Sequence, residues 1–184
     1  MTTLTGTERR IDVGAWLRYG ILGGVIAGIT FAMFEMIMAV VLDGRDAFFM
    51  PLRMIGGIGL GEQALDPGTS LLTAGGVGLV IHMILSMMYA VVVAAVLSLI
   101  PQLSASRAAV LISASVAGFA LWIVNFYVLA QVFGWTWFPN NTNAAVQFVG
   151  HTFLYGSVLG LVLDRTYFQP ARAMNEGNGA GPTG

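Results

Sequence analysis

The stretch Leu79–Leu97, LVIHMILSMMYAVVVAAVL, decides what kind of fold this chain adopts. It is almost entirely apolar, and its one ionisable side chain is His82. An α-helix rises about 1.5 Å per residue, so about 20 apolar residues are needed to cross the hydrocarbon core of a bilayer. With its flanks, the stretch therefore predicts a transmembrane helix over residues 71–100.

The composition of the whole chain indicates a membrane protein. Hydrophobic residues make up 57% of the 184 residues, charged residues make up 9%, and the mean hydropathy is +0.80. A chain of this kind cannot form a water-soluble surface of normal polarity. Three further apolar runs are long enough to cross a bilayer. We therefore predict an all-α integral membrane protein, a four-transmembrane-helix bundle with spans at 19–42, 71–100, 108–133 and 144–163.

Charge and cysteine content exclude several classes of function. The chain has no cysteine, which rules out disulfides, thiolate catalysis and Cys-ligated metal sites. Its 8 basic and 9 acidic residues give no basic surface, so we expect no nucleic-acid partner. The expected partner is the lipid bilayer, and a homo-oligomer or a larger membrane complex is left open.

Arginine positions predict the orientation. Four spans put both termini on one side, and that side carries six of the arginines, Arg9, Arg10, Arg18, Arg107, Arg165 and Arg172. Because positively charged loops stay cytoplasmic, we expect both termini to be cytoplasmic, in the bacterial inner (plasma) membrane. The chain then divides into a cytoplasmic N-terminal segment 1–18, the membrane domain 19–163, and a disordered cytoplasmic tail 164–184.

Two external segments follow from this orientation. Segment 44–70 is too apolar for a free loop, and we expect it to lie along the membrane surface or to cap the bundle. Its glycines, in GGIGLG at 56–61, lack the spacing of a nucleotide-binding loop and are expected to permit close packing. The aromatic run GWTWFP at 134–139 is expected to anchor the outer membrane interface.

The two halves of the membrane domain show a weak resemblance to each other. When the first and third spans are aligned, Ala27-Gly28 falls on Ala117-Gly118 and Glu35 falls on Asn125. In the second and fourth spans, His82 then falls on His151. The pattern predicts a 2+2 helix-pair repeat, although apolar spans also align by chance.

The polar residues inside the spans are the candidate functional residues. Counted from the outer ends, Glu35, His82, Asn125 and His151 all lie in the outer half of the bilayer. A charged side chain at membrane depth costs roughly 2.5–3.5 kcal/mol on insertion scales unless it meets a partner. We therefore expect these four side chains to face one another.

Helical spacing supports this inward orientation. Gly20, Gly24 and Gly28 recur every four residues of the first span, a pattern that permits close helix contact. Asn143, Gln147, His151 and Tyr155 form a polar stripe on the fourth span. Around the central four residues we expect a second group that completes the pocket, namely Gln147, Tyr155, Trp122 and Ser86.

Several functions remain open. His82 and His151 with Glu35 match the ligands of a divalent metal ion, and the two histidines match the axial ligands of haem b, with Asn125 beside them. Glu35 and a histidine also suit a proton-coupled transporter of small solutes, as a homo-oligomer, or a quinone pocket. No nucleophile motif supports an enzyme. Alternatively, the cluster only fixes the bundle of an accessory or assembly subunit.

Overall fold

The computed structural model describes residues 13–179, and within this range the chain is helical and has no strand. The α-helices are α1 (Val13–Asp43), α2 (Met50–Leu60), α3 (Leu71–Leu99), α4 (Arg107–Ile123), α5 (Ala130–Phe133), α6 (Trp137–Asn140), α7 (Ala144–Val149), α8 (Val158–Leu163) and α9 (Gln169–Gly179). Short 3₁₀ turns form η1 (Arg45–Ala47), η2 (Glu62–Leu65) and η3 (Pro101–Ser104). Wider π-helical segments form η4 (Val124–Leu129), η5 (Gly150–Ser157) and η6 (Asp164–Phe168).

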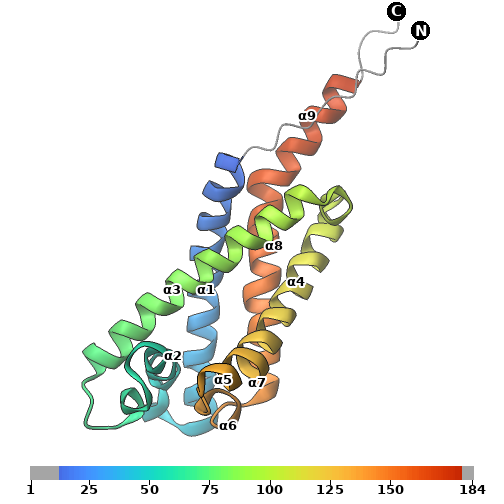
Figure 1. Cartoon of the computed structure of the whole chain (residues 1–184). Coiled ribbons are helices and arrows are strands. Elements are labelled where there is room, and N and C mark those ends of the chain that lie inside the picture. Colours follow the sequence, from blue (N-terminus) through green and yellow to red (C-terminus); the bar gives the residue numbers. More distant parts are fainter. Residues whose placement is uncertain (1–12, 180–184) are drawn as a thin grey trace, which may run out of the picture.

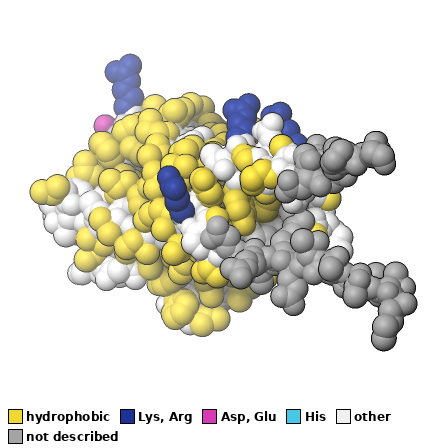
Figure 2. Space-filling model, turned by 90° about the horizontal axis from the view of Figure 1, so that it is seen from above, with side chains coloured by type: hydrophobic (Ala, Val, Ile, Leu, Met, Phe, Trp, Pro, Cys, Tyr) yellow, Lys and Arg dark blue, Asp and Glu magenta, His cyan; other side chains and the backbone are white. Residues whose placement is uncertain are grey.

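Four continuous helices within the described residues are long and apolar enough to cross a membrane, which confirms the predicted number of long apolar helices. They cover Val13–Asp43, Leu71–Leu99, Arg107–Phe133 and Ala144–Asn175. Their outward faces carry large apolar side chains, among them Leu72 at 87% exposure and Val132 at 70%. Figure 2 shows hydrophobic side chains over most of the visible surface, with only a few arginines. Such a surface is consistent with an integral membrane protein.

The helices are arranged as two pairs. The first span, α1, packs along the second, α3, while α4 packs along η5 and α8 of the fourth span. Contacts of α1 with η5 and α8 join the two pairs. By contrast, α3 and α4 diverge from their connection at η3 and make few contacts with each other (Figure 1). This pairing is the one that a 2+2 repeat requires, but the repeat itself stays a prediction.

Glycines allow both pairs to pack with their backbones in contact, as the spacing predicted. A Cβ atom at Gly24 would lie 2.6 Å from Met87 Cα of α3. A Cβ atom at Gly118 of α4 would lie 2.2 Å from the carbonyl oxygen of His151. Neither distance is possible for real atoms, so these positions require glycine at the observed helix separation.

The cap predicted at 44–70 is a folded part of the bundle. It contains η1, α2 and η2, and α2 packs against the beginning of α3. Here one glycine of each helix faces the backbone of the other, since a Cβ atom at Gly56 would lie 2.2 Å from the carbonyl oxygen of Ala74 and one at Gly78 would lie 1.8 Å from that of Leu52. The Arg53 guanidinium then holds the following loop by donating to the carbonyl oxygens of Ala64, Asp66 and Thr69, at 3.0, 3.1 and 2.8 Å.

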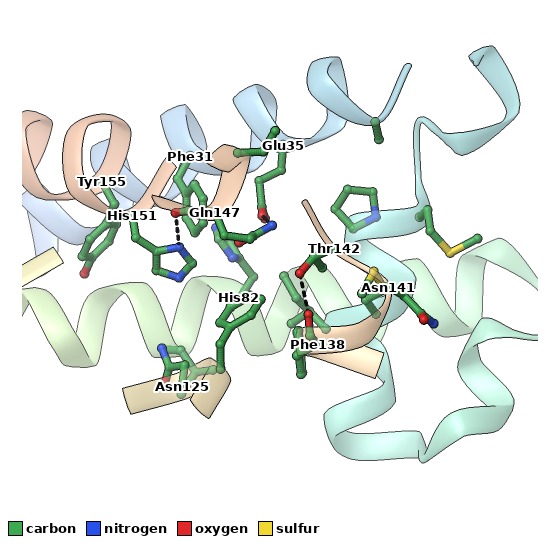
Figure 3. Close-up of a pocket in the computed structure, with 18 of the residues that line it drawn as sticks. Phe31, Glu35, His82, Asn125, Phe138, Asn141, Thr142, Gln147, His151 and Tyr155 are labelled. Atoms are coloured by element: carbon green, nitrogen blue, oxygen red, sulfur yellow. Dashed lines mark hydrogen bonds between the residues drawn. The ribbon is translucent and has the colours of Figure 1, made fainter. Parts of the chain in front are cut away.

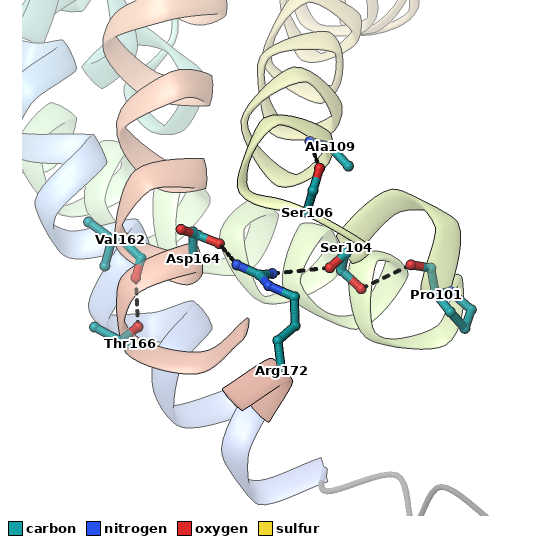
Figure 4. A network of polar contacts seen from close by, with 8 residues as sticks. All are labelled: Pro101, Ser104, Ser106, Ala109, Val162, Asp164, Thr166 and Arg172. Atoms are coloured by element: carbon teal, nitrogen blue, oxygen red, sulfur yellow. Dashed lines mark hydrogen bonds and ion pairs between the residues drawn. The ribbon is translucent and has the colours of Figure 1, made fainter. Parts of the chain in front are cut away.

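The fourth span does not end at residue 163, and the predicted disorder of the tail is wrong for residues 164–179. There the chain continues as η6 and α9. The buried carboxylate of Asp164 pairs with Arg172 of α9, and Arg172 also donates to the Ser104 carbonyl oxygen at 3.1 Å (Figure 4). An ion pair within the helix and a long-range hydrogen bond to Ser104 therefore hold a segment whose composition is polar. Of the predicted N-terminal segment 1–18, residues 13–18 belong to α1, which begins at Val13. Residues 1–12 and 180–184 lie outside the described part of the chain.

Candidate functional site

A cavity of about 280 Å³ lies inside the bundle at the end that carries α2. It is bounded by α1, α3, η4 and η5, and covered by α2 and the α6 region (Figure 3). Exposed polar residues, Asp43, Asn141 and Asn143, lie at its rim. The cavity therefore opens at this end of the bundle.

The four residues expected to meet do line this one cavity. Glu35 comes from α1, His82 from α3, Asn125 from η4 and His151 from η5. Of the second group, Gln147, Tyr155 and Ser86 also line the cavity. Trp122 does not line the cavity but packs behind it, against the cluster that contains the lining residues Phe126 and Phe138, and its place in this second group stays a prediction.

Glu35 has a neutral partner. Its Oε1 accepts a hydrogen bond of 2.6 Å from Nε2 of Gln147, and the two side chains are only 8% and 6% exposed. The other amide atom, Gln147 Oε1, is buried and has no partner among the described residues. No arginine or lysine lines the cavity, so this carboxyl group has no cation among the lining residues, and its hydrogen-bonding capacity is only partly used within the chain.

Both histidines are held by backbone carbonyl groups. Nε2 of His82 donates to the Gly28 carbonyl oxygen at 2.9 Å, and Nδ1 of His151 donates to the Gln147 carbonyl oxygen at 3.0 Å. A carbonyl oxygen only accepts, so these two ring nitrogens carry the hydrogens. In a neutral imidazole the remaining nitrogen is an acceptor, and this applies to Nδ1 of His82 and Nε2 of His151.

Aromatic rings surround the two imidazoles. Phe31 packs against both, with ring centroids 4.5 Å from His151 and 5.8 Å from His82. Phe126 packs edge-on against His151 at 5.5 Å. The imidazole orientations are therefore fixed by packing as well as by hydrogen bonds.

Tyr89 and Asn125 close the side of the cavity between α3 and η4. The Tyr89 hydroxyl donates to Asn125 Oδ1 at 2.8 Å, where the two helices otherwise make few contacts. On the opposite side, the Tyr155 hydroxyl donates to the Ser86 carbonyl oxygen at 2.6 Å and ties η5 to α3. The polar groups thus bind the helices together around the cavity without filling it.

Two of the site residues lie in π-helical segments. Asn125 lies in η4 and His151 lies in η5. A π turn inserts an extra residue and changes which side chains share a face, and such turns are frequent at functional sites. The corresponding parts of α1 and α3 are regular α-helix, so the two halves differ at their polar positions.

The residues that the sequence did not point to come mainly from the cap and the α6 region. Met54 of α2 and the aromatic residues Trp135 and Phe138 line the cavity. Trp137, expected at the membrane interface, is instead buried, and its Nε1 donates to the Met54 carbonyl oxygen at 3.0 Å. Tyr89 lies seven residues after His82, on the same face of α3, and that spacing is a signal that would have found it.

The geometry gives no support to a metal site. Within residues 13–179, no group of three or more His, Cys, Asp or Glu side chains is placed to hold a metal ion. The predicted ligand set of Glu35, His82 and His151 is thus brought into one cavity but not into coordination geometry. Phe31 packs against both imidazoles where a haem would need open space, which disfavours haem b between them.

Comparison of the chain with protein-family models, with curated proteins and with solved structures gives no match. The function therefore has to be argued from the cavity.

Proposed function

We propose that the protein binds a small, largely apolar molecule with a polar head group inside the cavity. The cavity itself carries this proposal. Its volume of about 280 Å³ far exceeds the roughly 10–15 Å³ that a single water needs. Apolar and aromatic side chains form most of its wall, with a few polar groups converging on one region, which is the usual composition of a small-molecule site.

The hydrogen bonds of the cluster support a binding role over a purely structural one. Polar groups that only fix helix register are expected to bond to one another. Asn125 and Glu35 do bond to other side chains, Tyr89 and Gln147, but His82 and His151 bond only to backbone carbonyl groups and not to another member of the cluster. Each imidazole keeps one nitrogen for another partner.

We further propose that the cavity opens on the outer face of the bacterial plasma membrane, with both chain ends in the cytoplasm. The described arginines support this, because Arg18, Arg107, Arg165 and Arg172 belong to the end with η3 and α9. The chain has no native cysteine, so single cysteines at Asp46 and Arg107 provide clean labels. In intact cells, a membrane-impermeant maleimide should label Asp46→Cys and not Arg107→Cys. The reverse result would overturn this orientation.

Binding can be tested with three probes of one shape, phenylbutylamine, phenylbutanol and phenylbutanoate. The full chain is placed in phosphatidylcholine nanodiscs, and binding of each radiolabelled probe is measured by equilibrium dialysis against empty nanodiscs. At least one probe should bind saturably. Ala39→Trp, which fills the cavity, should abolish this binding, because Ala39 lines the wall.

The matched control is Ala120→Trp, since Ala120 is exposed on α4 and lies outside the cavity. This variant should bind like the unaltered chain. If no probe binds saturably, or if Ala39→Trp binds as well as Ala120→Trp, the proposed function is wrong.

The same preparation tests the cofactor hypothesis. An absorption spectrum with a Soret band that disappears in both His82→Ala and His151→Ala would replace the proposed function by haem binding. A homo-oligomeric transporter and an accessory subunit stay predictions, because no feature of the described residues favours either one.

A further inference from the structure

The cavity offers more hydrogen-bond acceptors than donors. Nδ1 of His82 and Nε2 of His151 are acceptors in the neutral rings, and no group in residues 13–179 donates to them. The second carboxylate oxygen of Glu35 also has no donor within that range. A molecule that satisfies these atoms must itself carry N–H or O–H groups.

Gln147 provides an independent observation of the same kind. This residue lines the cavity and is only 6% exposed. Its Oε1 has no hydrogen-bond partner among the described residues. Buried polar atoms are rarely left unpaired, and an unpaired one calls for a partner absent from the chain itself. Two donor groups face the inner cavity, the Asn125 amide nitrogen, whose Oδ1 is already used by Tyr89, and the Ser86 hydroxyl. The amides of Asn141 and Asn143 lie at the rim. The acceptor atoms of Glu35, Gln147 and the two histidines therefore outnumber the donor groups deep in the cavity.

The charge of the lining has one sign. Carboxylates come from Glu35 inside the cavity and from Asp43 at its rim, whereas the lining includes no arginine and no lysine. Neither arginine of the cap lines the cavity. Arg45 is exposed on η1, and Arg53 donates to three carbonyl groups of η2 and the loop that follows it. A cationic head group would therefore meet an opposite charge here and no like charge from an arginine or lysine.

Aromatic side chains add a second preference for a cation. Phe31 and Phe126 stand beside the imidazoles, and Tyr89, Trp135, Phe138 and Tyr155 complete the aromatic wall. The faces of such rings attract ammonium groups, and the attraction grows when water is excluded. The apolar part of the ligand would occupy the remaining, largely aliphatic wall.

We infer that the ligand of this cavity is a lipophilic amine, an apolar molecule with one protonated nitrogen whose N–H groups face Glu35, Gln147 and the two histidines. This inference rests on the proposed function and narrows it to one chemical class. A neutral hydroxyl compound would satisfy an acceptor but leave the carboxylate without a countercharge. An anionic compound would add a further acceptor to a site that already has too many.

The three probes separate these classes, since they differ only in the head group. In the unaltered chain, phenylbutylamine should bind about tenfold more tightly than phenylbutanol, the order expected for a desolvated charge interaction. Phenylbutanoate should bind no better than it does to Ala39→Trp. Glu35→Gln should remove the advantage of the amine and leave the affinity for the alcohol within about twofold, because glutamine keeps the acceptor and removes the charge.

Asp46→Asn is the matched control, because Asp46 is an exposed carboxylate of η1 outside the cavity. It should leave all three affinities unchanged. Equal affinities for the amine and the alcohol, tighter binding of the carboxylate, or an amine preference that survives Glu35→Gln would each overturn the inference while leaving a binding cavity in place. Failure of all three probes would instead overturn the proposed function.

Discussion

The two ends of the bundle each bury one carboxylate, and they treat it differently. At the end with η3 and α9, Asp164 is 1% exposed and is paired with Arg172. At the end with α2, Glu35 is 8% exposed and its hydrogen-bond partner is the neutral amide of Gln147. The first carboxylate therefore has a countercharge from within the chain, and the second lacks one. This difference supports the proposal that the second end binds a ligand, whereas the ion pair at the first end serves stability.

The largest effect is expected from separating the pair at the first end. Arg172→Met leaves the Asp164 carboxylate buried without a cation and removes the bond to Ser104. Removing one partner of a buried ion pair costs about 3–5 kcal/mol, and because Arg172 is 25% exposed we expect about 3 kcal/mol. Unfolding by SDS titration in mixed micelles measures the loss.

A second variant distinguishes loss of the pair from loss of packing. Arg172→Met combined with Asp164→Leu removes both charges, so it should recover most of the stability. If Arg172→Met alone costs less than about 1 kcal/mol, Asp164 is not a structural charge and the contrast between the ends fails.

The next effect concerns the helix contact behind His151. In Gly118→Ala, the new Cβ would meet the His151 carbonyl oxygen at 2.2 Å and Gly156 Cα at 3.1 Å, both of them backbone atoms. We expect a loss of about 1–3 kcal/mol, typical of overpacking, together with weaker probe binding because His151 must move. Gly76→Ala is the control, since nothing lies within 4 Å of its Cβ position. That variant should be neutral or stabilising by up to about 1 kcal/mol, so equal stability of the two variants would mean that the pair α4 and η5 is not closely packed.

The spans and the composition of the site were predictable, because both depend on patterns within single helices. A window of apolar residues predicts a span whatever its neighbours are. The depth of Glu35, His82, Asn125 and His151 predicted that they face a common space, and they line one cavity, although each of them bonds to a residue outside this group of four.

Other features depend on distant partners or on local helix geometry and left no such pattern. The polar composition after residue 163 predicted disorder, but Arg172 pairs with Asp164 and Ser104 and extends the helix. The π turns at Asn125 and His151 shift the helix hydrogen bonds by one residue and require no particular residue type, so the composition does not predict them. The burial of Trp137 depends on α2, whose position the sequence alone did not give.

A smaller effect is expected at the cavity end from Tyr89→Phe. The variant removes the hydrogen bond to Asn125 and keeps the ring, so it should cost about 0.6 kcal/mol, the average for such bonds between membrane helices. Tyr127→Phe should cost nothing, because Tyr127 is 47% exposed and its hydroxyl has no hydrogen bond to residues 13–179. A loss near 3 kcal/mol for Tyr89→Phe would show that the cavity end is held as firmly as the opposite end.

The smallest change in stability is expected at Glu35 itself. Glu35→Gln keeps an oxygen that accepts from Gln147 Nε2 and removes a charge that has no countercharge in the lining. The stability without ligand should therefore fall by no more than about 0.5 kcal/mol, because removing a buried charge that has no countercharge is not destabilising. Asp164→Asn, the equivalent change at the other end, leaves Arg172 without its partner and should be clearly destabilising. SDS titration of the two variants side by side measures the contrast. Equal losses of stability would mean that Glu35 has a cationic partner of its own, and would contradict the lipophilic-amine inference. A Glu35→Gln variant that keeps its stability but no longer prefers phenylbutylamine would show that this carboxylate acts in binding and not in folding.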